Sequence, residues 1–308
     1  MNFKSLIAHH QFQYPINWRE QFGRSAPLEV EIGFGLGEVL FKKAQEFPKR
    51  NFIGFEQNWE RICRTLQQID TVPSIQNVRL LKVDARIAFE RFFKEKSIDT
   101  IYSLFPCPWP KKAHIKHRLF SCDFLKLLNS RLKNSGALKI VTDHEDYFHW
   151  ILDQADDTGF AIQKNKISPR YNTKFERKWL LKGQEKFFEI NFSKKRHVSI
   201  SIKKELKLKS YSLKNFHFDR FRMEKETGEI SVILKDFLYD PKKYKGMAHV
   251  VVVEDYMIQH FWIAIVKKGK AWHVGRADGQ SFFQTPGINR SIELVYQAAL
   301  KTIESPTP

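Results

Sequence analysis

Cysteines are scarce in this sequence. Its 308 residues include only three, Cys63, Cys107 and Cys122, and no two of them have CxxC spacing. An odd number without that spacing argues against a disulfide framework and against a structural zinc site. Long apolar runs are also missing, since runs such as residues 261–266 are far shorter than the roughly 20 residues of a membrane-spanning helix. We therefore expect a reduced, cytoplasmic protein that does not cross a membrane.

Acidic residues are in deficit as well. The chain carries 52 lysines and arginines against 34 aspartates and glutamates, a formal net charge of +18. Residues 1–204 hold 36 basic and 22 acidic side chains (+14), and residues 205–308 hold 16 and 12 (+4). The segment from Lys194 to Lys225 is the densest, with 11 basic side chains against 3 acidic ones. This excess favours an anionic polymer as the partner over a membrane surface.

Short β-branched and aromatic runs alternate with amphipathic stretches along residues 28–143, which is typical of a parallel sheet covered by helices. Strands are expected at residues 28–32, 51–55, 78–83, 100–104 and 137–141. Helices are expected at residues 38–46, 58–69, 86–94 and 122–133, the last between Ser121 as a cap and Gly136 as a stop. Runs at residues 160–165 and 187–192 could add an antiparallel hairpin to the edge of this sheet. The sequence predicts a doubly wound α/β domain.

Ligands of such sheets bind beyond the carboxyl ends of the strands. The first predicted strand runs into a glycine turn, GFGLG, at residues 33–37. Carboxylates follow three other strands: Glu56, Asp84 and Asp143. The remaining strand runs into FPCPWPKK at residues 105–112, whose three prolines exclude a helix or a central strand. We expect one edge of the sheet to carry the glycine turn, three carboxylates and a rigid loop.

The loop and the residues after it are cationic. Four fixed positive charges occur without an acidic residue among them, at Lys111, Lys112, Lys116 and Arg118. A stiff cationic loop at a strand end is expected to contact phosphate. His114 and His117 have no acidic or cysteine neighbour, so no metal site is indicated. Trp109 either stacks on a nucleobase or packs within the loop.

The glycine turn has two interpretations as a ligand site. A dinucleotide fingerprint requires GxGxxG, but the third glycine here is Gly37, and Glu38 occupies the required position. Glu31 precedes the turn, and a carboxylate there suits the cationic amino acid end of S-adenosylmethionine. Glu56 would then accept hydrogen bonds from ribose hydroxyls, and Asp84 would reach the adenine edge. The structural alternative is a turn kept only for tight packing between strand and helix.

Together these motifs resemble the bacterial tRNA (guanine-N7)-methyltransferase family, TrmB type, over about residues 27–196. The resemblance rests on EIGFGLG (31–37), NFIGFE (51–56), DA (84–85), FPCPWPKKAHIKHRL (105–119), TD (142–143) and TKFER (173–177). It implies a Rossmann-like class I methyltransferase domain that transfers a methyl group from S-adenosylmethionine to N7 of a guanine in the tRNA variable loop. The implied cofactor-binding residues are Glu31, Gly33, Gly35, Gly37, Glu56 and Asp84. The implied substrate-binding residues are Lys111, Asp143, Thr173, Lys174, Phe175 and Glu176.

One residue departs from the family pattern, which has an aspartate where this chain has Cys107. Guanine N7 already carries an exposed lone pair, so the reaction does not require a general base. A carboxylate can still orient the base and stabilise the cationic product. We expect Asp143 to supply that charge with Glu176, while Cys107 contributes a weak hydrogen bond or thiolate character, or merely fills space. The alternative function is a catalytically silent tRNA-binding protein.

The last hundred residues fall outside the resemblance. We place the boundary between residues 204 and 205. Strands are expected at residues 230–234, 249–254, 261–266 and 271–274, followed by a helix at residues 289–303. These elements predict a small α+β extension with no catalytic spacing. Its role is either to stabilise the protein and extend the tRNA footprint, or to bind another partner, and no pattern indicates an oligomeric state.

Overall fold

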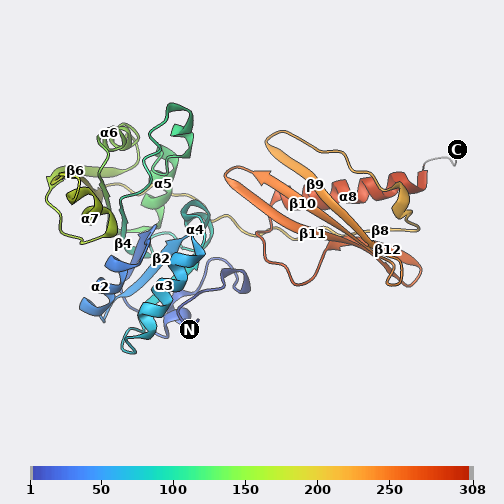
Figure 1. The fold of residues 1–308 in the computed structure, drawn as a ribbon, viewed down its shortest axis with the longest axis horizontal. Helices are drawn as coiled ribbons and strands as arrows, with labels where there is room; N and C mark the ends of the chain where they lie inside the picture. The colour runs from blue at the N-terminus through green and yellow to red at the C-terminus, as the bar shows by residue number, and fades with distance from the viewer. Residues whose placement is uncertain (1–2, 305–308) are drawn as a thin grey trace. The chain divides into compact units, whose positions relative to one another are not determined.

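The computed structural model describes residues 3–304, and the chain divides into two compact units between Lys203 and Lys204 (Figure 1). Unit 1 ends at Lys203 and unit 2 begins at Lys204. Within the described residues, no helix is long and apolar enough to cross a membrane.

Unit 1 is built on a seven-stranded sheet with the order β3-β2-β1-β4-β5-β7-β6. Its strands are β1 (Leu28–Ile32), β2 (Asn51–Glu56), β3 (Val78–Lys82), β4 (Ile98–Leu104), β5 (Leu132–Thr142), β6 (Phe160–Ile167) and β7 (Phe187–Lys194). The first five strands are parallel, and β7 and β6 add an antiparallel hairpin beside β5. The predicted doubly wound fold is confirmed, including the hairpin.

Four helices connect the five parallel strands, as Figure 1 shows: α2 (Glu38–Glu46), α3 (Trp59–Asp70), α4 (Ala85–Arg91) and α5 (Cys122–Arg131). The helix α1 (Trp18–Phe22) precedes β1, while α6 (Glu145–Asp153) and α7 (Lys174–Leu180) precede β6 and β7. The 3-10 turns are η1 (His9–Gln11) and η2 (Lys112–His117). Two predicted helix ends are wrong. The helix expected at residues 122–133 ends at Arg131 because the extended Leu132 already pairs with Ile98 of β4. The helix expected at residues 86–94 spans only Ala85–Arg91.

Both faces of the central strands are covered. Every residue of β1 and β2 is buried, as expected for a parallel sheet between two helical layers. Gly54 in β2 makes room for the turn that follows β1, because a Cβ atom there would lie 2.6 Å from the Phe34 ring. The ring packs with Leu40 and Leu66, which belong to α2 and α3. The glycine turn is thus seated on the core.

A segment after β7, residues 195–203, is fastened to unit 1 by polar side chains. The fully buried Arg131 donates hydrogen bonds to the carbonyl oxygens of Phe89 (2.7 Å) and Ile200 (2.7 Å). Asn129 donates to the Arg196 carbonyl oxygen (3.0 Å) and accepts from the backbone N–H of residue 198 (2.9 Å). Because a buried donor must keep its partners, this segment is an integral part of unit 1.

Unit 2 contains a five-stranded antiparallel sheet with the order β8-β12-β11-β10-β9. Its elements are β8 (Tyr211–Leu213), η3 (Phe218–Arg220), β9 (Ile230–Asp240), β10 (Lys245–Glu254), β11 (Met257–Lys268), β12 (Ala271–Arg276) and α8 (Pro286–Glu304). Ile288, Ile292 and Val295 of α8 share a core with Val250 of β10 and Ile263 of β11. The predicted α+β extension is confirmed, but β9, β10 and β11 are longer than expected and β8 was not predicted.

We expect Arg131→Met to lower the free energy of unfolding by about 3 kcal/mol, because the carbonyl groups of Phe89 and Ile200 lose buried donors. The control is Arg64→Met, since Arg64 forms an exposed pair with Glu60 on α3. That change should stay within about 0.5 kcal/mol. Urea unfolding followed by tryptophan fluorescence measures both, and equal small losses would show that Arg131 does not secure residues 195–203.

Candidate active site

The glycine turn between β1 and α2 has a left-handed backbone at all three glycines. The φ angles are 72° at Gly33, 58° at Gly35 and 72° at Gly37. A Cβ atom at Gly37 would lie 2.5 Å from Cγ2 of Thr65, so this glycine allows α2 and α3 to approach. A Cβ atom at Gly33 or Gly35 would meet nothing within 4 Å. The first two glycines therefore border open space, where a ligand can approach the backbone.

Glu31, near the end of β1, is a buried carboxyl group with an unused acceptor. The residue is 3% exposed, and its Oε2 has no hydrogen-bond partner. Burial raises the pKa of Glu31 to about 8, a shift that Lys43 opposes and Glu38 reinforces. The Tyr102 hydroxyl, on the neighbouring strand, also lacks a hydrogen-bond partner. A cationic group would relieve this desolvated carboxylate, so the site fits the ammonium group of S-adenosylmethionine.

Glu56, at the end of β2, joins the glycine turn to α3. Its Oε1 accepts from the backbone N–H groups of Gln57 (2.9 Å) and Asn58 (3.0 Å), and its Oε2 accepts from that of Gly35 (3.1 Å). The Arg61 guanidinium lies 3.4 Å from Oε2. The three backbone N–H groups fix the shape of the turn. A ribose hydroxyl that binds Glu56 would therefore share Oε2 with Arg61 or replace the Arg61 contact.

Asp84, after β3, caps α4 by accepting from the Arg86 backbone N–H at 2.8 Å. Its other oxygen accepts from the Gln57 side chain at 3.1 Å. Gln57 directly follows Glu56, so this hydrogen bond connects the ends of β2 and β3. The three carboxylates predicted for the cofactor, Glu31, Glu56 and Asp84, therefore lie at the ends of the neighbouring strands β1, β2 and β3, as expected from the sequence.

The proline loop after β4 has a strained backbone, with positive φ at Phe105 (56°) and Trp109 (44°). Trp109 is half-buried against the imidazole rings of His114 and His117, at centroid distances of 5.7 and 5.2 Å. Loop packing is thus the observed role of this ring. Cys107 is exposed, which excludes the buried-filler interpretation for this side chain.

Arg118 does not join the exposed cations that the sequence predicts. It is only 7% exposed, and its Nε donates to the Pro108 carbonyl oxygen at 2.9 Å. Its guanidinium lies 5.3 Å from the ring centroids of both Tyr147 and Trp150. Arg118 therefore holds the proline loop on α6, while three exposed lysines remain for an anionic ligand: Lys111, Lys112 and Lys116.

Asp143 follows β5 and is half-buried. Burial raises the pKa of its carboxyl group above the ordinary value, while its own backbone N–H, His144 and Lys178 act in the opposite direction. Gln184, after α7, donates to the Asp143 backbone carbonyl oxygen at 3.0 Å. This hydrogen bond ties the segment that follows α7 to the end of β5.

The TKFE segment begins α7 with a capping box. Thr173 accepts from the Glu176 backbone N–H at 3.1 Å, and the Glu176 carboxylate accepts from the Thr173 N–H at 3.4 Å. Glu176 is 0% exposed and also accepts from the N–H groups of Arg170 (3.1 Å) and Tyr171 (2.8 Å). In this structure Glu176 and Thr173 therefore shape the segment, although the resemblance implies substrate contact. Phe175 is 40% exposed and stacks on Phe105, so it is available to a ligand.

Two of the four basic side chains around α7 are already paired. Arg170 forms an ion pair with the buried Glu189, and Arg177 forms one with Glu38. Lys174 and Lys178 are exposed, and neither forms an ion pair within residues 3–304. These two lysines add to the exposed positive charge that the lysines after the proline loop contribute at this edge of the sheet.

Glu38 is a residue whose role the sequence did not reveal. It is the first residue of α2, directly after the glycine turn, and its Oε2 accepts from the Lys174 backbone N–H at 2.8 Å. The other oxygen binds the Arg177 guanidinium. An acidic residue at a helix start is common because of the helix dipole, so that position gave no signal of a second helix as partner. Glu38 joins the glycine turn to α7.

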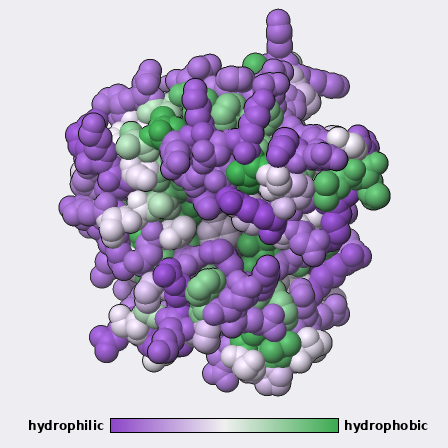
Figure 2. Space-filling model, turned by 90° about the vertical axis from the view of Figure 1, so that its left-hand side faces the viewer, coloured by the Kyte–Doolittle hydropathy of each residue, from purple (hydrophilic) through white to green (hydrophobic). Residues whose placement is uncertain are grey.

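Figure 2 shows a mostly hydrophilic face with separate apolar patches. Exposed apolar side chains of the α7 region include Phe175, Leu180 and Leu181. Among the described residues, no three His, Cys, Asp or Glu side chains form a group that could hold a metal ion.

A family model described as "Putative methyltransferase" matches residues 25–189. A tRNA (guanine-N(7)-)-methyltransferase of Chlorobium phaeobacteroides is 44% identical over 182 residues, which cover 59% of this chain and 89% of the relative. An enzyme of the same name from Thermotoga maritima is 35% identical over 181 residues, 58% of each chain. A solved antibiotic-related methyltransferase has a TM-score of 0.45 at 22% identity, covering 58% of this chain and 92% of that one.

The match to the family model covers more than half of the chain, and the Chlorobium protein is matched over most of its length. The matched region contains the glycine turn, the proline loop and TKFE at the same sheet edge. The chain therefore belongs to the S-adenosylmethionine-dependent tRNA (guanine-N7)-methyltransferase family, TrmB type.

Proposed function

We propose that this protein methylates N7 of a guanine in the variable loop of tRNA. Family membership supports this reaction, and one structural observation supports the location of the active site. Glu31, whose carboxyl oxygen has no partner, lies near the end of β1, and the half-buried Asp143 follows β5 of the same parallel array. A free tRNA substrate and three unpaired cysteines also suit a cytoplasmic location.

The cofactor end of the site is formed by the ends of β1, β2 and β3. S-adenosylmethionine, when bound, supplies an electrophilic methyl group on a sulfonium. The free oxygen of Glu31 would bind its ammonium group, while Gly33 and Gly35 leave room for it along the backbone. Glu56 would bind the ribose and Asp84 the adenine edge. Each of these proposed contacts follows from the position of the carboxylate at the end of its strand.

The base end of the site is formed by Asp143 and α7. Guanine N7 attacks through its own lone pair, so the protein must orient the base rather than deprotonate it. The Asp143 carboxylate would accept from the donor edge of guanine and stabilise the positive charge that develops on the ring. Phe175 would stack on the base, and Lys111 and Lys174 would bind neighbouring phosphates. Glu176 acts indirectly, by holding residues 170–173 in place.

A second function, tRNA binding without catalysis, is favoured only by Cys107, where the family has an aspartate. Cys107 is exposed on the loop. The reaction needs a negative charge near the base. Cys107 no longer supplies a carboxylate but Asp143 still does, so we assign this charge to Asp143.

Transfer of labelled methyl from S-adenosylmethionine to unmodified tRNA tests the function directly. We expect the label in 7-methylguanosine after nucleoside analysis. The control is tRNA whose variable-loop guanine is replaced by adenine, which should remain unlabelled. Binding of both tRNA and S-adenosylmethionine without any label would instead establish the silent binding protein.

We expect Asp143→Asn to slow methyl transfer by about 100-fold or more, because it removes preorganised charge from the base site. Cys107→Ala should change the rate less than about three-fold.

The rate should also depend on pH through Asp143. Burial raises the Asp143 pKa, so the acidic fall in rate should begin at a higher pH than for an ordinary carboxyl group, and it should disappear in Asp143→Asn. Single-turnover rates across pH measure both effects. Similar small losses in the two variants would overturn the role of Asp143.

Glu31 should make cofactor binding release a proton. Below a pKa of about 8 the free carboxyl group holds a proton, and pairing with an ammonium group lowers that pKa. The affinity should therefore rise between pH 6 and 7.5, where the ammonium of S-adenosylmethionine stays mostly charged. Calorimetry in two buffers of different ionisation enthalpy measures the released proton. Glu31→Gln should bind more weakly without this release, and unchanged proton release in that variant would contradict the assignment.

A further inference from the structure

The sheet of unit 2 has one covered face and one open face. Val250, Ile263 and Val274 point to the covered face, where they share a core with α8. Side chains alternate along a strand, so their neighbours in sequence point to the open face. The register sets them in rows: Lys245 pairs with Val266, which pairs with His273.

The next row of the open face begins at Met247, which pairs with Ala264. Ala264 pairs with Gly275, and these two small residues leave the row hollow at β11 and β12. A Cβ atom at Gly275 would meet only Cβ of Ser210, at 3.7 Å. Above this floor lies a pocket of about 530 Å³. We call this pocket the sheet hollow.

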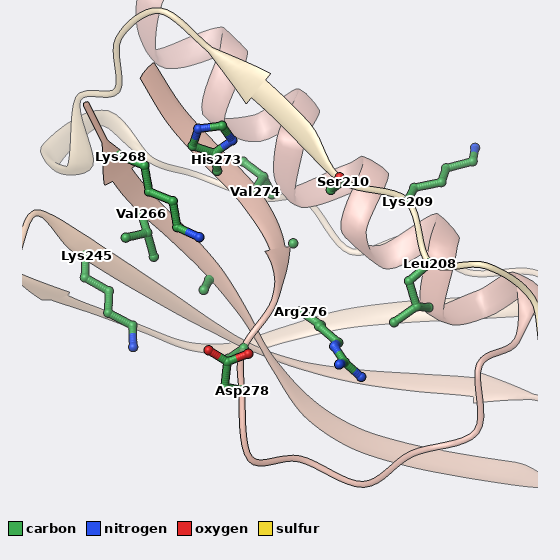
Figure 3. Close-up of a pocket in the computed structure, with 13 residues that line it drawn as sticks. Leu208, Lys209, Ser210, Lys245, Val266, Lys268, His273, Val274, Arg276 and Asp278 are labelled. Carbon is green, nitrogen blue, oxygen red and sulfur yellow. The ribbon is translucent and has the colours of Figure 1, made fainter. Parts of the chain in front are cut away.

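Cations surround the sheet hollow (Figure 3). Lys245 of β10 and Lys268 of β11 line it from the open face. Arg276 of β12 lines its rim, because its register partner Ile263 points to the covered face. No ion pair involves these three side chains within the described part of the chain, and Asp278 is the sole acidic residue of the lining. Lys209 also lines the hollow but lies 3.7 Å from Glu293. Like charges gathered around a concave surface attract an anion.

An aromatic pair lies in the row beyond the hollow floor. His249 pairs with Trp262 across β10 and β11, and their rings stack at a centroid distance of 4.8 Å and an angle of 22°. Both side chains are half-buried, so part of each ring faces solvent. Nucleobases stack on such rings, and phosphates bind the lysines and arginines beside them.

We propose that the open face of the unit 2 sheet binds RNA, with a phosphate in the sheet hollow and a base against Trp262 and His249. The unpaired cations match the phosphate of a nucleotide, and the neighbouring aromatic pair matches its base. The cations also exclude a basic partner. That this RNA is the tRNA substrate rests on the proposed function. Unit 2 then increases the affinity for tRNA without taking part in methyl transfer.

The test neutralises the hollow in the full chain, with Lys245→Gln, Lys268→Gln and Arg276→Gln combined. The matched control combines Lys214→Gln, Lys225→Gln and Lys242→Gln, which removes the same charge from exposed positions outside the hollow. Filter binding to tRNA at several salt concentrations gives the dissociation constant and its salt dependence. We expect at least about ten-fold weaker binding and a smaller salt slope for the hollow variant, and less than about two-fold weaker binding for the control.

Trp262→Ala separates stacking from charge. It should weaken tRNA binding about ten-fold while leaving the salt slope unchanged, since stacking releases no counterions. Thermal unfolding of each variant identifies any loss of folding. Equal weakening by the hollow variant and its matched control would show that only net charge matters, and unchanged binding in the hollow variant would overturn the proposal.

The proposed function and this inference fail separately. Absence of 7-methylguanosine with the unmodified protein would reject the methyl transfer, whereas the binding comparison does not depend on catalysis. Calorimetric affinity for S-adenosylmethionine should be the same in all these variants, because none of the changed residues belongs to unit 1. If the hollow variant binds tRNA normally but no longer binds an acidic protein from the same cells, the face recognises a protein and our proposal is wrong.

Discussion

The parallel alignment of β1 to β5 is the constraint on which the site depends. Parallel strands end at one edge of the sheet, so residues as far apart in the sequence as Glu31 and Asp143 lie along that same edge. Glu31, Glu56 and Asp84 lie on one side of β4 in the strand order, and Asp143 follows β5 on the other. The carboxylates that we propose for the cofactor and the one that we propose for the base are therefore separated in the strand order by β4, which leads into the proline loop.

Glu38 links these two halves. Its carboxylate binds the first N–H of α7 and the Arg177 side chain, although α7 comes 136 residues later in the chain. Since Glu38 directly follows Gly37, any shift of the glycine turn on cofactor binding would act on the helix that carries Phe175. One carboxylate therefore joins the start of α2 to the start of α7.

The sequence predicted what depends on local pattern. Strand periodicity and turn residues placed Glu56, Asp84 and Asp143 at strand ends, and the structure agrees. It could not predict roles that depend on distant backbone groups. Arg118 looked like a free cation, but the Pro108 carbonyl oxygen and two aromatic rings bury it. The sheet hollow was equally hidden, because Ala264 and Gly275 become neighbours only through the pairing of β11 with β12.

The exchange of the loop aspartate for Cys107 has a consequence for Asp143. Phe105 donates to the Val141 carbonyl oxygen at 2.7 Å, so the loop starts beside the end of β5. Two carboxylates near one another raise the pKa of one of them, and burial already raises that of Asp143. With cysteine in place of that aspartate, the loop adds no carboxylate beside β5, and burial remains the main cause of the raised Asp143 pKa. The proposed role of Asp143 therefore rests on a single carboxylate, for a reaction in which the base needs orientation and charge but no deprotonation.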